Sequence, residues 1–428
     1  PTFNLLTSVM DDMRPENKYL HLMDEQEAIT KAQALLNRPG DANVSPLAVY
    51  RHAAKADSVQ QRRPNVVLIM MESMSSKLMK HFGQSETLTP FLDSLYTRSI
   101  SFRNFYSAGI HTNHGLYATL YSFPAMMKRN LMKGSVIPRY SGLPTVLKEN
   151  GYYNLFFMTH EGQYDNMNAF FRTNGYDEVF SQEDYPADKV VNSFGVQDDF
   201  LYDYAIPVLN QRAATGQPFF ATLLSISNHP PYVIPPFFHP KTSEPEMQIV
   251  EYADWALRQF FEEARKQPWF DNTIFVLEGD HGKLVGDAEC ELPESYNHIP
   301  LMIYSSRIHP EEKNTFGGQV DIQPTILGLL NIDYLQNNFG VDLLKEERPC
   351  MFYTADNMVV GRNDTLLYLY NYETQQELTY DIGNGKLNAV PMDDSFLPLK
   401  EYSFSMLQSA EFLVKHGKTL NSIPFTQQ

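Results

Sequence analysis

The chain has 428 residues, of which 43% are hydrophobic and 20% are charged. This composition is typical of a globular protein with a substantial core, and it excludes disorder on a large scale. The formal net charge of −17, without any basic run, argues against a nucleic-acid partner, because nucleic acids attract basic surfaces.

The first 63 residues indicate a lead-in to the main domain. Helical spacing of apolar residues predicts a helix near 19–37, and a polar connector follows it. No apolar run reaches the ~20 residues of a membrane span, and no signal peptide is present. Because the chain begins at Pro1 without a methionine, we interpret it as a processed or trimmed piece.

From residue 64 to about 345, short apolar strands alternate with amphipathic helices. "NVVLIMME", "YYNLFFMTH", "FFATLLSISNH", "TIFVLEGDH" and "IPLMIY" have the texture of buried strands. The alternation predicts an α/β fold with a mainly parallel sheet between helices. Residues 346–428 change pattern again and predict a small C-terminal α+β subdomain of antiparallel strands and one closing helix.

Four of the predicted strands end on polar side chains: Glu72, His160, the pair Asn228–His229, and the pair Asp280–His281. Ligands of open parallel sheets bind outside the carboxyl ends of the strands. We therefore expect these side chains to converge on one edge of the sheet.

Two carboxylates and one imidazole among these residues suggest a site for a divalent cation. "EGDHG" offers Asp280 and His281 as adjacent oxygen and nitrogen ligands, and Glu72 adds a second carboxylate. Such an oxygen-rich set suits Mn²⁺ best, with Mg²⁺ or Zn²⁺ as alternatives. The simpler interpretation is that Asp280 caps a helix and His281 is a loop histidine.

A second candidate element is the loop "SAGIHTNHGLYATLYSFP", residues 107–124. We expect it to lead into a helix beginning near Gly115, so that Thr112 lies just before a helix N-terminus, where backbone N–H groups favour an anion such as phosphate. An ordinary N-cap threonine is the alternative interpretation.

Taken in order, these motifs resemble the alkaline-phosphatase-like superfamily, in particular its sulfatase-like branch and the lipoteichoic acid synthase and phosphoglycerol transferase group. The resemblance implies that Glu72, Thr112, Asp280 and His281 bind the metal, and that Thr112 is also the nucleophile. It implies that His229 contacts the phosphate or protonates the leaving group, with Asn228 beside it. "FMTHEGQYDNMNAFFRTNGYDEVF" resembles the segment that positions the headgroup, with His160 as its first contact.

Some residues depart from that group. Lipoteichoic acid synthases carry a tryptophan and an arginine in the headgroup segment, whereas residues 164–168 here contain no cation and Arg172 lies further on. His114 stands where related transferases often have arginine, so a phosphate contact by His114 is also an expectation. Sulfate-ester hydrolysis is disfavoured, because neither cysteine lies in the motif that is converted to formylglycine. Two cysteines also argue against phosphoethanolamine transferases, which usually carry several disulfides.

The resemblance implies an extracytoplasmic catalytic domain of a membrane-anchored enzyme, with the anchor preceding residue 1. It would move the headgroup of a phospholipid such as phosphatidylglycerol to a glycan or polyol acceptor through a phospho-threonine. The alternatives are a phosphodiesterase-type hydrolase of the same fold and a non-catalytic envelope protein that binds a headgroup. Cys290 and Cys350 form either one disulfide or two separate thiols.

Overall fold

A computed structural model describes residues 19–38, 45, 49–54, 63–134, 136–383 and 385–421. The segment 1–18, which the resemblance places after a membrane region, lies outside the described residues. Packing divides the chain into two compact units. We call residues 57–107 and 143–317 the large-sheet unit. We call residues 1–56, 108–142 and 318–428 the small-sheet unit. The division expected from the sequence, at 63/64 and 345/346, stays a prediction.

The large-sheet unit is built on eight strands in the order β5-β4-β6-β2-β7-β8-β3-β9. Their bounds are β2 Asn65–Met71, β3 Ile100–Tyr106, β4 Tyr153–Met158, β5 Glu178–Phe180, β6 Phe219–Leu224, β7 Thr273–Gly279, β8 Leu301–Tyr304 and β9 Glu311–Gly318. The neighbours from β5 to β7 are parallel, whereas β8 is antiparallel to both β7 and β3. The prediction of a mainly parallel sheet is confirmed.

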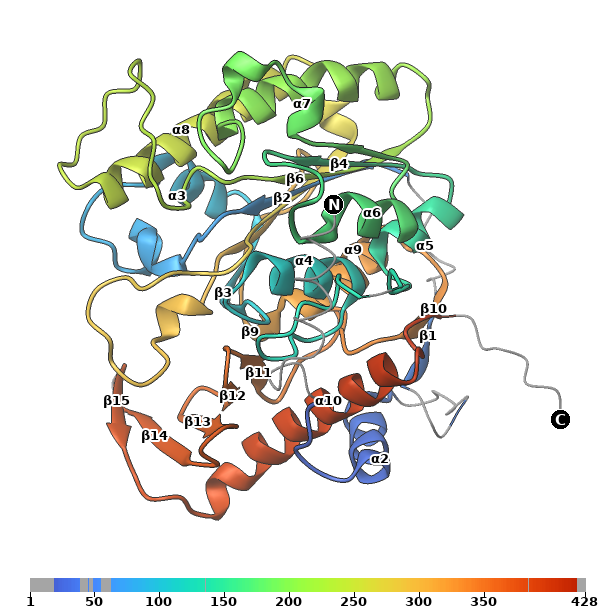
Figure 1. Ribbon diagram of the computed structural model, residues 1–428, viewed down its shortest axis with the longest axis vertical. Helices are drawn as coiled ribbons and strands as arrows, with labels where there is room; N and C mark the ends of the chain where they lie inside the picture. The colour runs from blue at the N-terminus through green and yellow to red at the C-terminus, as the bar shows by residue number, and fades with distance from the viewer. Residues whose placement is uncertain are drawn as a thin grey trace, which may run out of the picture. The chain divides into compact units, whose positions relative to one another are not determined.

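Helices cover both faces of this sheet. They are α3 Pro90–Tyr96, α5 Leu143–Glu149, α6 Met167–Thr173, α7 Asp198–Ala213 and α8 Pro245–Ala264. Figure 1 shows α3, α7 and α8 along one side of the sheet, where Val67 and Ile69 of β2 share a buried cluster with Phe260 of α8. On the other face, Phe156 stacks on Phe171 of α6 with ring centroids 4.1 Å apart. Every residue of β2 is buried, as expected for a continuous apolar strand that is covered on both faces.

The small-sheet unit contains the five-stranded antiparallel sheet β11-β12-β13-β14-β15 and the pair β1-β10. The bounds are β1 Tyr50–Ala53, β10 Tyr334–Asn337, β11 Met351–Thr354, β12 Met358–Arg362, β13 Leu366–Asn371, β14 Glu377–Gly383 and β15 Lys386–Ala389. Its helices are α2 Glu25–Leu36, α4 Thr112–Tyr121, α9 Ile322–Leu329 and α10 Leu397–Lys415. The predicted C-terminal strands and closing helix are therefore confirmed.

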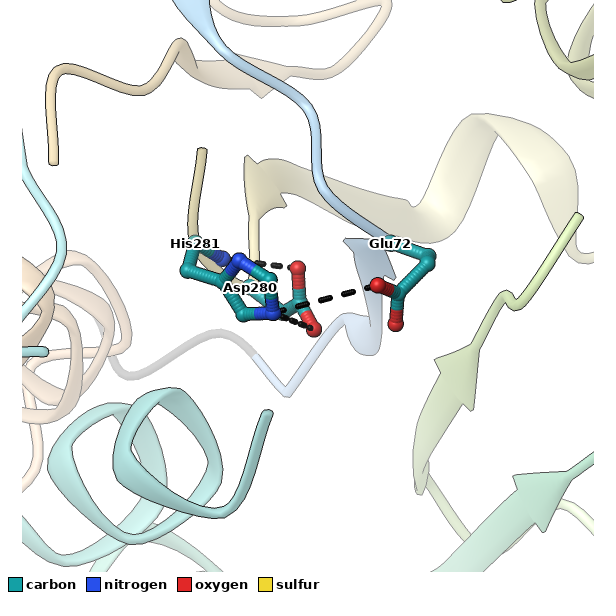
Figure 2. A group of neighbouring side chains, drawn as sticks. All are labelled: Glu72, Asp280 and His281. Atoms are coloured by element: carbon teal, nitrogen blue, oxygen red, sulfur yellow. Dashed lines mark hydrogen bonds and ion pairs between the residues drawn. The ribbon is translucent and has the colours of Figure 1, made fainter. Parts of the chain in front are cut away.

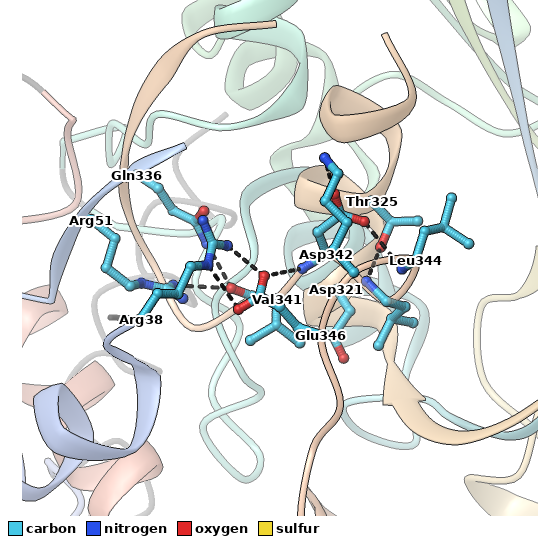
Figure 3. A network of polar contacts seen from close by, with 12 residues as sticks. Arg38, Arg51, Asp321, Thr325, Gln336, Val341, Asp342, Leu344 and Glu346 are labelled. Carbon is cyan, nitrogen blue, oxygen red and sulfur yellow. Dashed lines mark hydrogen bonds and ion pairs between the residues drawn. The ribbon is translucent and has the colours of Figure 1, made fainter. Parts of the chain in front are cut away.

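Helices α2 and α10 lie side by side although they are far apart in sequence (Figure 1). The backbone N–H of Leu20 donates to Glu411 Oε2 at 3.0 Å, and Lys415 pairs with Glu25 at 2.9 Å. A polar network holds the segment around β10 (Figure 3). Buried Arg51 donates to the carbonyls of Asn338 and Gly340 at 2.7 and 2.9 Å.

Short 3₁₀ turns connect these elements. They are η2 Ser76–Leu78, η3 Lys80–Phe82, η4 Tyr164–Asn166, η5 Gln182–Asp184, η6 Ala187–Lys189, η7 Phe270–Asn272, η8 Glu294–Tyr296, η9 Gln319–Asp321 and η10 Asp394–Phe396. Among the described residues, no helix combines the length and the apolar character needed to cross a bilayer.

Candidate metal centre

The register of the large sheet brings the predicted ligands together. Strands β2 and β7 are parallel, and Met71 is paired with Gly279. The residues directly after them, Glu72 and Asp280, therefore leave the sheet at neighbouring points of its carboxyl edge. The backbone N–H of Asp280 donates to the carbonyl of Met71 at 3.0 Å, which continues the ladder by one bond.

Glu72, Asp280 and His281 form a compact group, with one ligand atom of each within 4.8 Å of the others (Figure 2), which we call the metal group. His281 Nε2 lies 3.8 Å from Glu72 Oε1 and 3.6 Å from Asp280 Oδ2. Both carboxylate side chains have no exposed surface. Burial, and then the neighbouring carboxylate of Asp280, raise the pKa of Glu72 well above its usual value. Two buried carboxylates this close are costly unless a cation offsets their charge.

The donor set of this group fits a divalent cation. Ligands ~2.1 Å from an ion are separated from one another by about 3.0–3.5 Å, close to the distances between these side-chain atoms. His281 Nδ1 lies 2.8 Å from the carbonyl of Gly282, and a carbonyl can only accept, so Nδ1 must carry a proton. In the neutral ring, Nε2 then offers its lone pair toward the two carboxylates, as a metal ligand must.

Two further residues, Ser73 and Lys283, make hydrogen bonds around the metal group, and no local sequence pattern predicts either of them. Ser73 donates its hydroxyl to Glu72 Oε1 at 2.7 Å and its backbone N–H to Asp280 Oδ1 at 2.8 Å. Its φ of 51° is left-handed, which is uncommon for a residue other than glycine. Lys283 donates to Asn228 Oδ1 at 2.7 Å, and burial lowers the pKa of Lys283 to about 8.

Asn228 is buried behind the metal group and holds its backbone. Its Nδ2 donates to the carbonyls of Glu72 and Ser73 at 3.2 and 3.1 Å. With Lys283 on its Oδ1, the polar atoms of this side chain are all engaged within the protein. These contacts favour a role in positioning Glu72, while the expected contact with substrate stays a prediction.

Asp198, the first residue of α7, fixes the segment that leads to Asn228 and His229. Its Oδ1 accepts the backbone N–H groups of Ile226 and Ser227 at 2.8 and 3.0 Å. Burial raises the pKa of Asp198 to about 6. A start-of-helix aspartate is common in sequences, so only the fold reveals this long-range contact.

The two histidines expected to contact substrate come after β4 and β6. His160 is buried beside the ring of Tyr164, 4.6 Å away, and burial lowers the pKa of His160. His229 is partly exposed, and its Nδ1 lies 2.6 Å from the carbonyl of Pro230, so its Nε2 is the atom left to accept or donate a proton. Its ring lies beside Phe194 at 4.1 Å. The expected roles of both residues stay predictions.

Arg172 is exposed on α6 and is engaged locally. It donates to Asn168 Oδ1 at 2.7 Å and to the carbonyl of Val179 at 3.2 Å. These contacts direct its guanidinium along β5, so a contact with a headgroup would require that Arg172 give them up. The role stays a prediction.

Thr112 and His114 belong to the small-sheet unit. Helix α4 begins at Thr112 and not near Gly115, because His111 is still extended while Gly115 is buried within the helix. His114 is fully buried, and a Cβ on Gly109 would lie 2.3 Å from its Nδ1, so glycine is required at that position. His111 Nε2 pairs with Asp356 at 2.6 Å. The placement of Thr112 as a metal ligand stays a prediction.

Both cysteines are free thiols in the structure, which corresponds to the second of the two expectations. Burial raises the pKa of Cys290 to about 11 and that of Cys350 to about 12. Burial therefore favours the protonated thiol of both residues at neutral pH, and a protonated thiol is a poor nucleophile.

Known proteins share both sequence and fold with this chain. Lipoteichoic acid synthase 1 of Bacillus subtilis is 25% identical over 350 residues, which cover 75% of this chain and 53% of the relative. Lipoteichoic acid synthase of Staphylococcus saprophyticus is 24% identical over 367 residues, covering 78% and 54%. The chain thus spans about half the length of the curated relatives that it matches.

Solved structures agree. A protein of the alkaline phosphatase superfamily from Vibrio parahaemolyticus has a TM-score of 0.83 and 25% identity, covering 94% of this chain and 98% of the other. The lipoteichoic acid synthase LtaP from Listeria monocytogenes has a TM-score of 0.72 and 20% identity, covering 91% and 98%, and shows the same fold. The sulfatase family profile matches residues 64–332, more than half of the chain. The resemblance inferred from the motifs is confirmed: the chain belongs to the sulfatase family, within the alkaline phosphatase superfamily of phosphotransferases and hydrolases.

Proposed function

We propose that this chain is the catalytic part of a metal-dependent transferase that moves the phosphoglycerol headgroup of a phospholipid to a hydroxyl acceptor. The observation that carries the proposal is the buried group of Glu72, Asp280 and His281 at the carboxyl edge of the sheet, in a chain whose relatives include lipoteichoic acid synthases. Mn²⁺ is the proposed ion, with Mg²⁺ or Zn²⁺ as alternatives.

The nucleophile of the proposed reaction is the hydroxyl of Thr112. A divalent ion, when bound, would lower the pKa of this hydroxyl and offset charge on the phosphoryl oxygens. Thr112 Oγ would form a bond to phosphorus while the bond from phosphorus to the diacylglycerol oxygen breaks. Thr112 would release its hydroxyl proton to solvent, and protonated His229 would give its proton to the diacylglycerol oxygen, so that diacylglycerol leaves as an alcohol and a phospho-threonine remains.

In the second step, an acceptor hydroxyl attacks the phospho-threonine and Thr112 Oγ leaves. His229 would take the proton of the acceptor, and Thr112 Oγ would regain a proton from solvent, which restores the starting state. The N-terminus of α4, where Thr112 is the first residue, presents backbone N–H groups that suit the charged phosphoryl oxygens. His114 would support the same end of the helix.

The remaining predicted residues are proposed to bind the substrate. His160, held neutral by burial, would contact the headgroup, with Asn228 and Arg172 as further contacts. The acceptor would be a glycan or polyol of the cell envelope. We propose that the catalytic part lies outside the cytoplasm and that the full protein is anchored in the membrane before residue 1.

A hydrolase of the same fold is the second candidate. Residues 164–168 contain no cation, and Arg172 donates to Asn168 and Val179. A segment without an available cation offers little to fix an anionic glycerophosphate chain, so water could replace the acceptor alcohol.

Intact-protein mass after incubation with phosphatidylglycerol and Mn²⁺ tests the proposal. Wild type and Thr119→Ala, a control threonine in the same helix, are expected to gain one phosphoglycerol unit, whereas Thr112→Ala gains none. Absence of the adduct together with Mn²⁺-dependent hydrolysis of a soluble phosphodiester would support the hydrolase. If the protein forms no adduct, binds no metal and turns over no substrate, the remaining interpretation is a non-catalytic protein that binds a headgroup.

A further inference from the structure

Large apolar side chains are exposed in one region of the large-sheet unit. Among its described residues, 63–107 and 143–317, four large apolar side chains are exposed: Tyr164 at 44%, Val191 at 46%, Phe237 at 57% and Leu284 at 44%. They lie in the segments after β4, β5, β6 and β7, respectively. We call these four residues the apolar rim.

The four strands run parallel, so the apolar rim lies at the same edge of the sheet as the metal group. In Figure 1 the long segments after β6 (yellow-green, upper left) and β7 (golden yellow, lower left) both extend toward the left of the view. Scattered exposed apolar residues are normal on a protein surface, but their restriction to the ligand-binding edge is informative.

The segment that carries Phe237 is held firmly in place. The next residue, Phe238, packs on Trp255 of α8 with ring centroids 5.8 Å apart. Glu251 of α8 accepts the backbone N–H groups of Lys241 and Thr242, both at 2.9 Å. The ring of Phe237 also packs on Trp255, with centroids 5.6 Å apart, so one side of it rests on α8 while 57% of the side chain stays exposed. Because this loop is already ordered, its contact with a partner costs little entropy.

The rim is continuous with the candidate site. A narrow pocket that includes His229 is lined by residues of the segments after β5 and β6. Apolar Val191, Phe194, Val196, Ile226, Pro231 and Val233 share this lining with polar Asn192, Gln197 and Ser227. Tyr164 of the rim lies against His160. His160 and His229, which are proposed to contact the headgroup and the leaving group, are thus next to Tyr164 and Val191 of the apolar rim.

We propose that the apolar rim docks the catalytic unit on a lipid surface, so that the headgroup is taken from a lipid that stays in its layer. This deepens the proposed function and rests on it. Phe and Leu enter the boundary between headgroups and acyl chains, and Tyr favours the same boundary because it has one apolar and one polar end. An embedded lipid would present its phosphate at the depth where the rim places His160 and His229.

The acidic charge near the apolar rim distinguishes docking through apolar side chains from the electrostatic attraction of a basic surface to anionic lipid. The segment around Leu284 also carries Asp287, Glu289 and Glu291, with Lys283 as the nearby cation, and the whole chain has a net charge of −17. Anionic lipid should therefore repel this edge, and salt screens repulsion between exposed charges. Binding through the apolar rim is expected to strengthen as the salt concentration rises.

The test uses the double variant Phe237→Ser/Leu284→Ser, which leaves His160, His229 and the metal group intact. Leu397→Ser is the matched control, because Leu397 is 47% exposed in the small-sheet unit. Co-sedimentation is measured with phosphatidylcholine vesicles that contain phosphatidylglycerol as the minor lipid. The double variant is expected to bind on the order of tenfold more weakly than wild type and the control, because two half-exposed side chains lose their burial in lipid.

Turnover separates docking from chemistry. The double variant should turn over a soluble diester, bis(p-nitrophenyl) phosphate, like wild type, while its turnover of vesicle phosphatidylglycerol falls with its binding. Equal vesicle binding by the double variant, or binding that salt abolishes, would overturn the docking proposal. So would a wild-type dimer that the double variant loses, because the rim would then join two copies. Failure of wild type on both substrates would reject the proposed function, while co-sedimentation would still decide the docking.

Discussion

Replacing Asn228 by alanine tests whether this residue positions the metal group or binds substrate. The substitution removes two hydrogen bonds, to the carbonyls of Glu72 and Ser73, and the acceptor of Lys283. At about 0.5–1.5 kcal/mol for each bond to a carbonyl, we expect the free energy of unfolding to fall by about 1–3 kcal/mol. Residues that orient metal ligands typically change metal affinity by about 10–100-fold, so Mn²⁺ should bind that much more weakly.

Asn154→Ala is the matched control for this prediction. Asn154 is also buried in the large-sheet unit, and its Nδ2 donates to the carbonyls of Pro144 and Gly175 at 2.6 and 2.9 Å. It should lose similar stability without any change in Mn²⁺ affinity. Calorimetric titration with Mn²⁺ and urea unfolding measure the two effects. If Asn228→Ala binds Mn²⁺ like wild type and shows only a raised KM for the donor, the positioning role is refuted and the substrate contact is supported.

Three further predictions concern charge and metal. Burial raises the pKa of Asp254 to about 7, from an ordinary value of 3.8. Between pH 3.8 and 7 the carboxyl group is therefore protonated in the folded state but ionised in the unfolded state. The stability that this protonation contributes is complete below about pH 4 and is lost as the pH rises through 7. Urea unfolding against pH should therefore show wild type losing up to about 4 kcal/mol relative to Asp254→Asn, and parallel profiles would contradict this. Arg348→Met leaves buried Asp321 without its partner and should lower the free energy of unfolding by about 3–5 kcal/mol. Adding Asp321→Asn should restore part of this loss. If the losses of the two single variants instead add up in the double variant, the two side chains are not coupled. Mn²⁺ at 100 times its Kd should stabilise wild type by about 2.7 kcal/mol but leave the thermal midpoint of Glu72→Gln unchanged, and an equal shift in both would exclude Glu72 as a ligand.

The buried strands can be predicted because each is a continuous apolar run with a polar residue at its end. Covered parallel strands need such runs, and the residues directly after them gather at the carboxyl edge. This rule alone identifies Glu72, Asp280 and His281, and the structure brings them together. The direction of β8 cannot be predicted in this way, because "IPLMIY" resembles its parallel neighbours. The connection from β7 contains only a 3₁₀ turn, and an antiparallel neighbour does not need the helical crossover that a parallel one requires.

Other features depend on contacts that no local pattern encodes. The loop sequence predicts a helix that begins near Gly115, but α4 begins three residues earlier, at Thr112, and Gly115 is buried inside it. Ser73 donates to Asp280, Lys283 donates to Asn228, and Asp198 accepts from Ser227, and each partner is distant in sequence. Their roles depend on the register of β2, β6 and β7, which the sequence of a single chain does not specify.

The separation of α2 from α10 along the chain has a consequence for biosynthesis. The large-sheet unit ends at residue 317, so Glu72, Asp280 and His281 can reach their final register while later residues are still being synthesised. The small-sheet unit joins residues before 57 to α10, and the backbone N–H of Thr354 donates to the carbonyl of Ala108, just before α4. The helix that carries Thr112 therefore packs only after the last quarter of the chain, residues 318–428, has been synthesised. A ribosome-bound intermediate would therefore order Glu72, Asp280 and His281 before Thr112, so the proposed nucleophile would be in place only when synthesis is nearly complete.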